Sequence, residues 1–367
     1  MYFNFSKLDY SRVNELLEIK ENNILAAEFY NLYLSTDEYH FNNEEIMSLK
    51  KKEATSYDVF NQILKKMNIS YSDENYLKVN KNSKLDNLIQ LDEKEYIENP
   101  YFKLIKSLNI KEKNWYLSEQ YYLPYEAFAY DEIRIDSSSF KEVTPFAYFK
   151  DRFFYPAIIQ DETIWMSLIP HEINTMKEPI NEAYGNVLVF GLGLGYYAYM
   201  VSNKDNVNKV TIIEKDKTVI DLFNKYLINL FPHKQKIKII NEDAFNYLDN
   251  MKDKYDYTFV DIYHNVGDGF PLFKKFKSYE KRYINTKFRY WIETSLLAMM
   301  RRYVLTLYEE KTIHNFKDED YLKAKDDNDR FINKLYFYLK DYEFNSFEEF
   351  RDFLSDESLN KILINLK

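Results

Sequence analysis

The stretch VLVFGLGLGYYAYM, Val187 to Met200, holds three of the six glycines of a 367-residue chain. Its glycines are Gly191, Gly193 and Gly195, and they follow the apolar run Val187 to Phe190. A short apolar run that ends in glycines predicts a buried strand followed by a tight turn. A turn of this kind into a helix, here predicted over Tyr196 to Ser202, lets the backbone and its N–H groups approach a ligand closely.

The spacing of these glycines counts against a dinucleotide-binding loop and excludes a P-loop. The dinucleotide fingerprint is G-x-G-x-x-G, whereas here the third glycine comes one residue early and the bulky Tyr196 stands at the sixth position. A phosphate-binding P-loop requires Gly-Lys-Ser/Thr, which does not follow. The stretch therefore favours a nucleoside ligand without a pyrophosphate.

Strands and helices alternate regularly after the glycine stretch. The pattern predicts strands over Val210 to Glu214, Ile237 to Asn241 and Tyr257 to Tyr263, with helices over Lys217 to Phe231 and Ala244 to Met251. This alternation predicts an α/β fold with a Rossmann-like, mostly parallel sheet and helices on both faces. The pattern leaves open whether Tyr303 to Leu307 is a fifth strand or the end of a helix.

The remaining segments differ in their periodicity. Apolar residues at helical spacing, as in Tyr57 to Met67, predict a helical N-terminal domain over 1–118. AFAYDEIRID alternates, and Arg152 to Leu168 reads as two strands around a polar turn, so a small β segment is expected over 119–170. We expect the sheet domain over 171–310 and a helical C-terminal extension over 311–367.

Three acidic residues follow the predicted strands in register with the glycine stretch. Glu214 comes 214 − 191 = 23 residues after Gly191 and ends the second strand, Asp243 follows the third, and Asp261 lies at the end of the fourth. In this order the sequence resembles the class I S-adenosylmethionine-dependent methyltransferases. The resemblance implies S-adenosylmethionine as cofactor, held by Gly191, Gly193, Gly195, Glu214, Lys215, Asp243, Ala244 and Asp261. Glu214 would bind the ribose hydroxyls, and Asp243 would face the adenine amino group.

Within that superfamily the sequence leans toward the spermidine-synthase-like branch. Val189 stands where many methyltransferases carry an acid, and spermidine synthase also lacks that acid and carries small strands before its sheet. The branch usually has Asp-Ser-Ser/Thr-Asp-Pro after the fourth strand, but Asp261 is followed here by Ile-Tyr-His-Asn. The second acid, which would help to bind and deprotonate a polyamine amine, is missing.

The loop after the fourth strand supplies the candidate catalytic residues Asp261, Tyr263 and His264. Transfer from a sulfonium requires alignment of the acceptor and a base where the acceptor must lose a proton. The unperturbed pKa of histidine lies near neutrality, so His264 is a candidate base; a loop histidine without a role is an equal alternative.

Further residues have a functional and a structural interpretation. Glu172 would position the methionine amino group or stabilise the first turn of its helix, and the latter is favoured. Gly267 and Gly269 indicate a turn with positive φ rather than a mobile flap. Trp291 and Glu293 would line the acceptor pocket, although a tryptophan on an amphipathic helix more often belongs to a core.

Composition narrows the functional classes. A net charge of −9 disfavours nucleic-acid binding, and the absence of cysteine with five unpaired histidines predicts no metal site. The longest apolar run is shorter than the ~18 residues of a membrane span, and we read no signal peptide. A soluble cytoplasmic protein is expected, and a homo-oligomer stays open.

Three functions are compatible with the sequence. The leading hypothesis is methyl transfer from S-adenosylmethionine to an unidentified small-molecule or protein acceptor. The second is aminopropyl transfer from decarboxylated S-adenosylmethionine. The third is a non-catalytic binding or scaffold protein with a retained nucleotide-binding fold.

Overall fold

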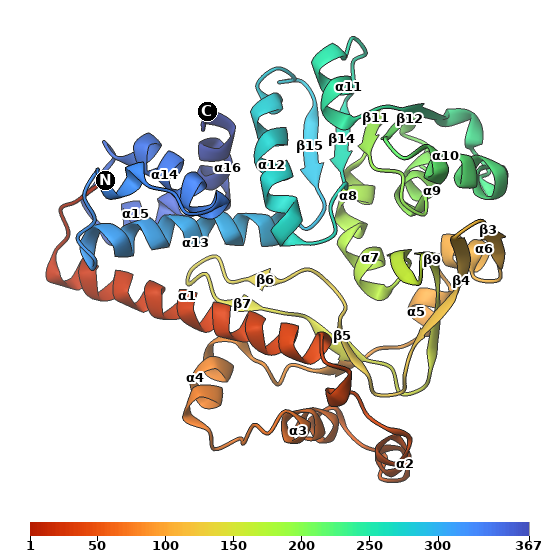
Figure 1. Ribbon diagram of the computed structural model, residues 1–367, viewed down its shortest axis with the longest axis horizontal. Helices are drawn as coiled ribbons and strands as arrows, with labels where there is room; N and C mark the ends of the chain where they lie inside the picture. The colour runs from red at the N-terminus through yellow and green to blue at the C-terminus, as the bar shows by residue number, and fades with distance from the viewer. Residues whose placement is uncertain (367) are drawn as a thin grey trace.

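The computed structural model describes residues 1–366 and centres on a five-stranded parallel sheet (Figure 1). The strand order is β13-β12-β11-β14-β15. The strands are β11 (Gly185–Phe190), β12 (Val207–Glu214), β13 (Ile237–Asn241), β14 (Tyr257–Val260) and β15 (Lys287–Tyr290). The predicted α/β fold with a parallel sheet is therefore confirmed.

Helices cover both faces of this sheet. Their bounds are α9 (Tyr196–Ser202), α10 (Lys217–Leu222), α11 (Ala244–Asn250), α12 (Val266–Glu280) and α13 (Glu293–Thr312). Phe190 of β11 packs on Phe276 of α12, with ring centroids 5.1 Å apart. Phe259, which pairs with Val189 and so points to the opposite face, stacks on Tyr197 of α9 at 4.1 Å.

One predicted helix boundary is corrected, one open assignment is settled, and one strand was not predicted. The helix predicted over Lys217 to Phe231 is α-helical only to Leu222 and continues as a π-helical turn over Phe223–Leu227. Tyr303 to Leu307, which the pattern left open, belongs to α13, and the fifth strand is β15. The residues of β15 alternate, with Phe288 and Tyr290 buried and Lys287 exposed. A segment of four residues is too short for this alternation to be recognised in the sequence.

The first hundred residues are mainly helical, as predicted. The helices are α1 (Lys7–Leu34), α2 (Asn43–Lys51), α3 (Ser56–Lys66), α4 (Glu74–Ser83), α5 (Lys94–Ile97) and α6 (Pro100–Ile105). Asn42 caps α2 in a reciprocal capping box with Glu45. Tyr57, expected on the apolar face of its helix, is exposed at its start.

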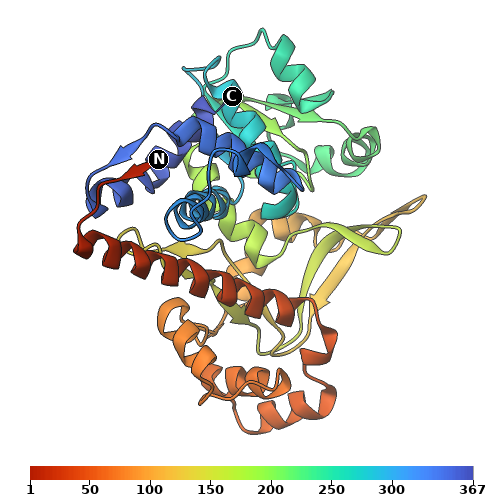
Figure 2. The same cartoon turned by 60° about the vertical axis from the view of Figure 1, so that its left-hand side comes forward.

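A small antiparallel sheet comes between these helices and the parallel sheet in the sequence. Its order is β10-β9-β4-β3, with β3 (Ile110–Glu112), β4 (Trp115–Tyr122), β9 (Phe153–Gln160) and β10 (Thr163–Ser167). The two strands predicted around the 160–162 turn are therefore confirmed. Figure 2 shows the long strands projecting from the body of the molecule.

The rest of this region forms only short strands. β2 (Ile89–Gln90), β5 (Ala127–Ala129) and β8 (Phe146–Tyr148) make one sheet, and β6 (Arg134–Ile135) pairs with β7 (Glu142–Val143). The alternating segment AFAYDEIRID is therefore interrupted, and residues 130–133 form a loop between β5 and β6.

The C-terminal helices pack beside the start of the chain. They are α14 (Asp327–Leu339), α15 (Phe347–Phe353) and α16 (Asp356–Asn365). Strand β1 (Tyr2–Phe3) pairs in parallel with β16 (Glu343–Phe344), so segments from the two ends lie side by side (Figures 1 and 2). No helix within residues 1–366 has the length and apolar character needed to cross a bilayer.

Candidate active site

The glycine stretch forms the predicted turn between β11 and α9. Gly191, Gly193 and Gly195 have φ values of 95°, 57° and 81°, in the left-handed region that side chains rarely adopt. A Cβ at Gly191 would also collide with the carbonyl oxygen of Asp261. The glycines thus serve the packing of two neighbouring strand ends as well as any ligand that passes over the turn.

Glu214 is fixed beside this turn by two backbone donors. The N–H of Leu192 donates to Oε2 at 3.0 Å, and the N–H of Asp216 donates to Oε1 at 2.8 Å. The carboxylate is buried, and each of its oxygens keeps lone pairs that a ribose hydroxyl can use. Lys215, which follows it, has an exposed side chain.

Asp243 lies at the end of β13 and caps α11. Its Oδ1 accepts the N–H groups of Phe245 at 2.9 Å and Asn246 at 3.1 Å. The Asp243 side chain is exposed, and its Oδ2 takes no part in these two hydrogen bonds. Ala244, which follows it, is buried. The arrangement is compatible with the adenine contacts predicted for Asp243 and Ala244, which stay predictions.

Asp261 and Glu172 are two half-buried carboxylates whose charges influence each other. Asp261 follows β14, where its N–H donates to the Phe190 carbonyl at 2.9 Å, and Glu172 lies on α7 (Pro170–Thr175). Burial raises the pKa of Asp261 to about 7. Burial, and then the charge of Asp261, raise the pKa of Glu172 well above its usual value.

Neither carboxylate has a counter-ion among residues 1–366. Within residues 1–366, no side chain or backbone donor forms a hydrogen bond or ion pair with either carboxylate group. A partly buried carboxylate without a partner is costly unless it is protonated or a ligand supplies a cation. The pair therefore has the chemistry of a site for a cationic ligand at the carboxyl ends of β11 and β14. Sequence analysis favoured a helix-stabilising role for Glu172 and did not foresee this pairing.

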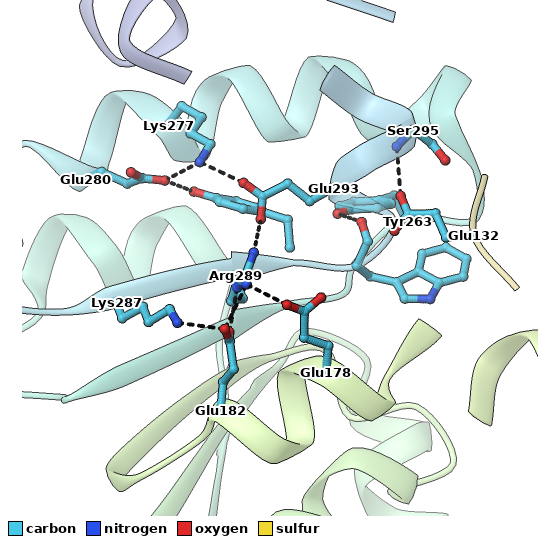
Figure 3. Close-up of polar contacts among 12 residues, drawn as sticks. Glu132, Glu178, Glu182, Tyr263, Lys277, Glu280, Lys287, Arg289, Glu293 and Ser295 are labelled. Atoms are coloured by element: carbon cyan, nitrogen blue, oxygen red, sulfur yellow. Dashed lines mark hydrogen bonds and ion pairs between the residues drawn. The ribbon is translucent and has the colours of Figure 1, made fainter. Parts of the chain in front are cut away.

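Tyr263 is a packing residue of the strand ends. Its buried hydroxyl donates to the carbonyl of Trp291 at 2.6 Å (Figure 3), and burial raises its pKa well above the usual value. Its ring lies on α12, where a Cβ at Gly269 would come within 2.7 Å of Cδ2. The geometry does not favour proton transfer through this hydroxyl, because its proton is already donated to a carbonyl.

The turn predicted at the two glycines near this ring is also corrected. Gly267 and Gly269 lie inside helix α12 without positive φ, so the predicted turn is absent. Gly269 is required instead by the close approach of the Tyr263 ring. This tertiary contact leaves no local signal in the sequence.

His264 lies at the surface beside these residues. Its side chain is 70% exposed, and Nδ1 lies 3.0 Å from Oδ2 of Asp268. Asp268 also accepts the backbone N–H groups of His264 and Asn265 and closes the capping box of α12. The structure therefore does not bring His264 into the pair of Glu172 and Asp261, and its role as a base stays a prediction.

A buried ion network holds β15 and the start of α13 (Figure 3). Lys277 of α12 lies 2.9 Å from Glu280 and 3.2 Å from Glu293. Arg289 of β15 lies 2.6 Å from Glu182 of α8 (Lys177–Glu182). Glu293 thus pairs with Lys277, and Trp291 is buried with its Nε1 donating to Thr175 at 2.9 Å. The sequence signal that could have predicted this network is Lys277, a lysine on the apolar face of α12.

Comparisons with known proteins match the part of the chain that carries these strand ends. Residues 167–287 match the family model described as the spermine/spermidine synthase domain. A polyamine aminopropyltransferase of Clostridium beijerinckii is 29% identical over 118 residues, which cover 32% of this chain and 40% of that protein. One of Methanocaldococcus jannaschii is 33% identical over 119 residues, covering 32% and 39%. The chain thus spans about two fifths of the curated relatives that it matches.

A solved structure is also similar. Spermidine synthase from Thermotoga maritima aligns with 16% identity and a TM-score of 0.30, over 47% of this chain and 68% of that one.

The family match corrects two expectations. Methyl transfer, the leading hypothesis, and S-adenosylmethionine, its methyl donor, are overturned, because the family model describes a spermine/spermidine synthase domain and the two relatives are polyamine aminopropyltransferases. The alternative of aminopropyl transfer fits these matches better. Residues 167–287 are therefore similar to the spermidine-synthase branch of the class I fold.

Proposed function

We propose that the protein transfers an aminopropyl group from decarboxylated S-adenosylmethionine to an amine. The observation that carries the proposal is the pair Glu172 and Asp261, two half-buried acids that form no ion pair within the described residues 1–366. The match of residues 167–287 to the spermine/spermidine synthase domain supports the same reaction.

The charge of this pair discriminates between the two possible donors. Decarboxylated S-adenosylmethionine carries a sulfonium and a primary ammonium and has no carboxylate. Two half-buried acids at one site stabilise both cations, and the cations in turn lower the pKa of the acids. The carboxylate of intact S-adenosylmethionine would face like charges at the same place.

The strand ends would hold the rest of the donor. Glu214 offers oxygens to the ribose hydroxyls, the glycine turn allows the nucleoside to pass close to the backbone, and Asp243 with Ala244 lies where the adenine would end.

The chemical step requires alignment and a base. The acceptor nitrogen attacks the aminopropyl carbon that is bound to sulfur, and the C–S bond breaks with its electron pair going to sulfur. Methylthioadenosine leaves as a neutral thioether, and the new C–N bond leaves an extra proton on nitrogen. We assign that proton to the carboxylate of Asp261, which directly follows β14 beside the glycine turn.

Release of methylthioadenosine tests the proposal directly. The protein is incubated with a linear diamine and either decarboxylated or intact S-adenosylmethionine, and the products are separated by chromatography. We expect methylthioadenosine only with the decarboxylated donor and the diamine together. Release of S-adenosylhomocysteine from the intact donor would contradict the proposal.

Thermal melting separates the enzyme from a scaffold. Methylthioadenosine at 100 times its dissociation constant should add about 2.7 kcal/mol to the free energy of unfolding. No shift with any adenosyl compound would favour the non-catalytic alternative.

A further inference from the structure

A small cavity lies where α1, the β6–β7 hairpin and α13 meet, and its lining carries more cations than acids. The cavity measures about 10 Å³. Its charged lining residues are the basic Lys20, Arg301 and Arg302 and the single acid Glu142. Apart from Asn23 the rest of the lining is apolar. Figure 1 shows the three segments side by side, and none of these residues lies within the family-matched range 167–287.

Arg301 is the most deeply buried cation of this cavity, with 4% of its surface exposed. Its Nε donates to the carbonyl of Leu354 at 2.9 Å, and its Nη2 pairs with the carboxylate of Asp356. Its third nitrogen, Nη1, is buried and forms no hydrogen bond within residues 1–366. A buried donor of a charged group is costly to leave unpaired, so Nη1 requires an acceptor.

Arg302 contributes a second donor of the same kind. Its Nη2 pairs with the carboxylate of Glu142, whereas its Nε is buried and has no partner among the described residues 1–366. The other polar side chains of the lining are satisfied. Lys20 pairs with Glu309, and Asn23 both donates to and accepts from backbone groups of the β6–β7 hairpin, at 2.8 and 3.1 Å.

The size of the cavity and the kind of group left over identify the chemistry of a ligand. A volume of this order accommodates one sphere of about the size of a water molecule, which excludes phosphate and other polyatomic anions. Both unpartnered atoms of the lining are cationic donors. A water molecule between them would need acceptors for its own two O–H groups, whereas a monatomic anion accepts from every side and also compensates buried positive charge.

We propose that this cavity binds one chloride ion, held by Nη1 of Arg301 and Nε of Arg302. The ion would join α13 to α1 and to the β6–β7 hairpin, and so would stabilise the packing of three segments that are distant in the sequence. The inference goes beyond the proposed function and is independent of it, because no lining residue belongs to the candidate active site.

Thermal melting at constant ionic strength tests the site. Sodium chloride is replaced stepwise by sodium gluconate, whose anion is too large for the cavity, so that general screening stays the same. A ligand that binds only the folded state raises the melting temperature. We expect the wild type to melt at a higher temperature in chloride, and bromide to act like chloride. Equal melting temperatures in chloride and gluconate would overturn the inference.

The substitution Arg302→Lys removes one of the two donors. Lysine keeps a positive charge for Glu142 but places a methylene group where Nε stands. We expect the Kd for chloride to rise roughly tenfold or more, as for a lost hydrogen bond to a charged group, and the chloride-dependent shift in melting temperature to fall accordingly.

Arg12→Lys is the matched control. Arg12 lies on α1 outside the cavity, its side chain is 36% exposed against 29% for Arg302, and it also pairs with an acid, Glu348. This variant should keep the chloride response of the wild type. An unchanged response in Arg302→Lys, or an equal loss in both variants, would contradict the site.

Bromide locates the ion without any substitution. Crystals of the wild type grown in sodium bromide are measured at the bromine absorption edge. We expect an anomalous peak within hydrogen-bond distance of Nη1 of Arg301 and Nε of Arg302, and this result supports the site even where Arg302→Lys does not fold. A map without a peak in the cavity overturns the inference.

Discussion

The two halves of the candidate active site are built in different ways. The donor half consists of the glycine turn, Glu214 and Asp243, which follow three successive strands of one sheet. The proposed acceptor half combines Asp261 with Glu172, which comes from a helix that precedes the sheet. The proposed donor residues therefore follow the local βα pattern, whereas the proposed acceptor residues are brought together by the packing of separate regions.

The largest expected effect separates chemistry from donor binding. We expect Asp261→Asn to lower kcat by about 10²- to 10⁴-fold, because the amide cannot take the proton of the acceptor nitrogen. Single-turnover release of methylthioadenosine measures the step, and calorimetry measures donor-side affinity. His264→Ala is the control and should retain most of the activity; the reverse pattern would make His264 the base.

Substitution of Glu214 should weaken nucleoside binding to the donor half. Glu214→Ala removes the acceptor for ribose hydroxyls and releases the N–H groups of Leu192 and Asp216. We expect the Kd for methylthioadenosine to rise roughly a hundredfold, as for two lost hydrogen bonds to a charged group. An unchanged Kd in calorimetry would mean that the nucleoside lies elsewhere.

The contact between the two halves should be sensitive to one methyl group. Gly191→Ala places a Cβ against the Asp261 carbonyl oxygen at positive φ, so we expect a loss of about 2 kcal/mol or more in the free energy of unfolding. Urea unfolding measures it. Gly267→Ala, inside α12, is the matched control and should stay within about 1 kcal/mol of the wild type. Equal effects would contradict a specific contact at Gly191.

The pH dependence should follow the acceptor half. Asp261 acts as a base only when unprotonated, so with its pKa raised to about 7 we expect kcat/KM to rise up to about pH 7 and then level off. The contribution of Asp261 to the free energy of unfolding changes with pH in the opposite direction, because a raised pKa in the folded state favours the protonated form. That contribution is present below about pH 4 and is lost as the pH rises through 7. A rate profile that is flat between pH 5 and 8 would exclude Asp261 as the base.

Sequence patterns predicted the donor half because each residue there marks the end of a strand. Glu214, Asp243 and Asp261 were predicted from their places after the periodic strands together with the family resemblance, and in the structure each ends or follows a strand of the sheet. Strand β15 was missed because four alternating residues merge into the helical pattern that follows.

The contacts around the acceptor half could not be predicted in this way. Glu132 reaches Ser295 across 163 positions, and Gly269 is explained only by the ring of Tyr263. Such contacts depend on tertiary packing, for which one sequence carries no periodic signal. The partnership of Glu172 with Asp261 is of the same kind.

Helix α1 couples the unfolding of two parts of the molecule. Its first half buries Val13, Leu16 and Leu17 in the core that contains the parallel sheet, and its second half buries Phe29 and Tyr33 in the core of the N-terminal helices. One unbroken helix of 28 residues, about 42 Å long, therefore belongs to both cores. Melting either core exposes half of a helix that the other core still needs, so the two are expected to unfold in a single cooperative transition.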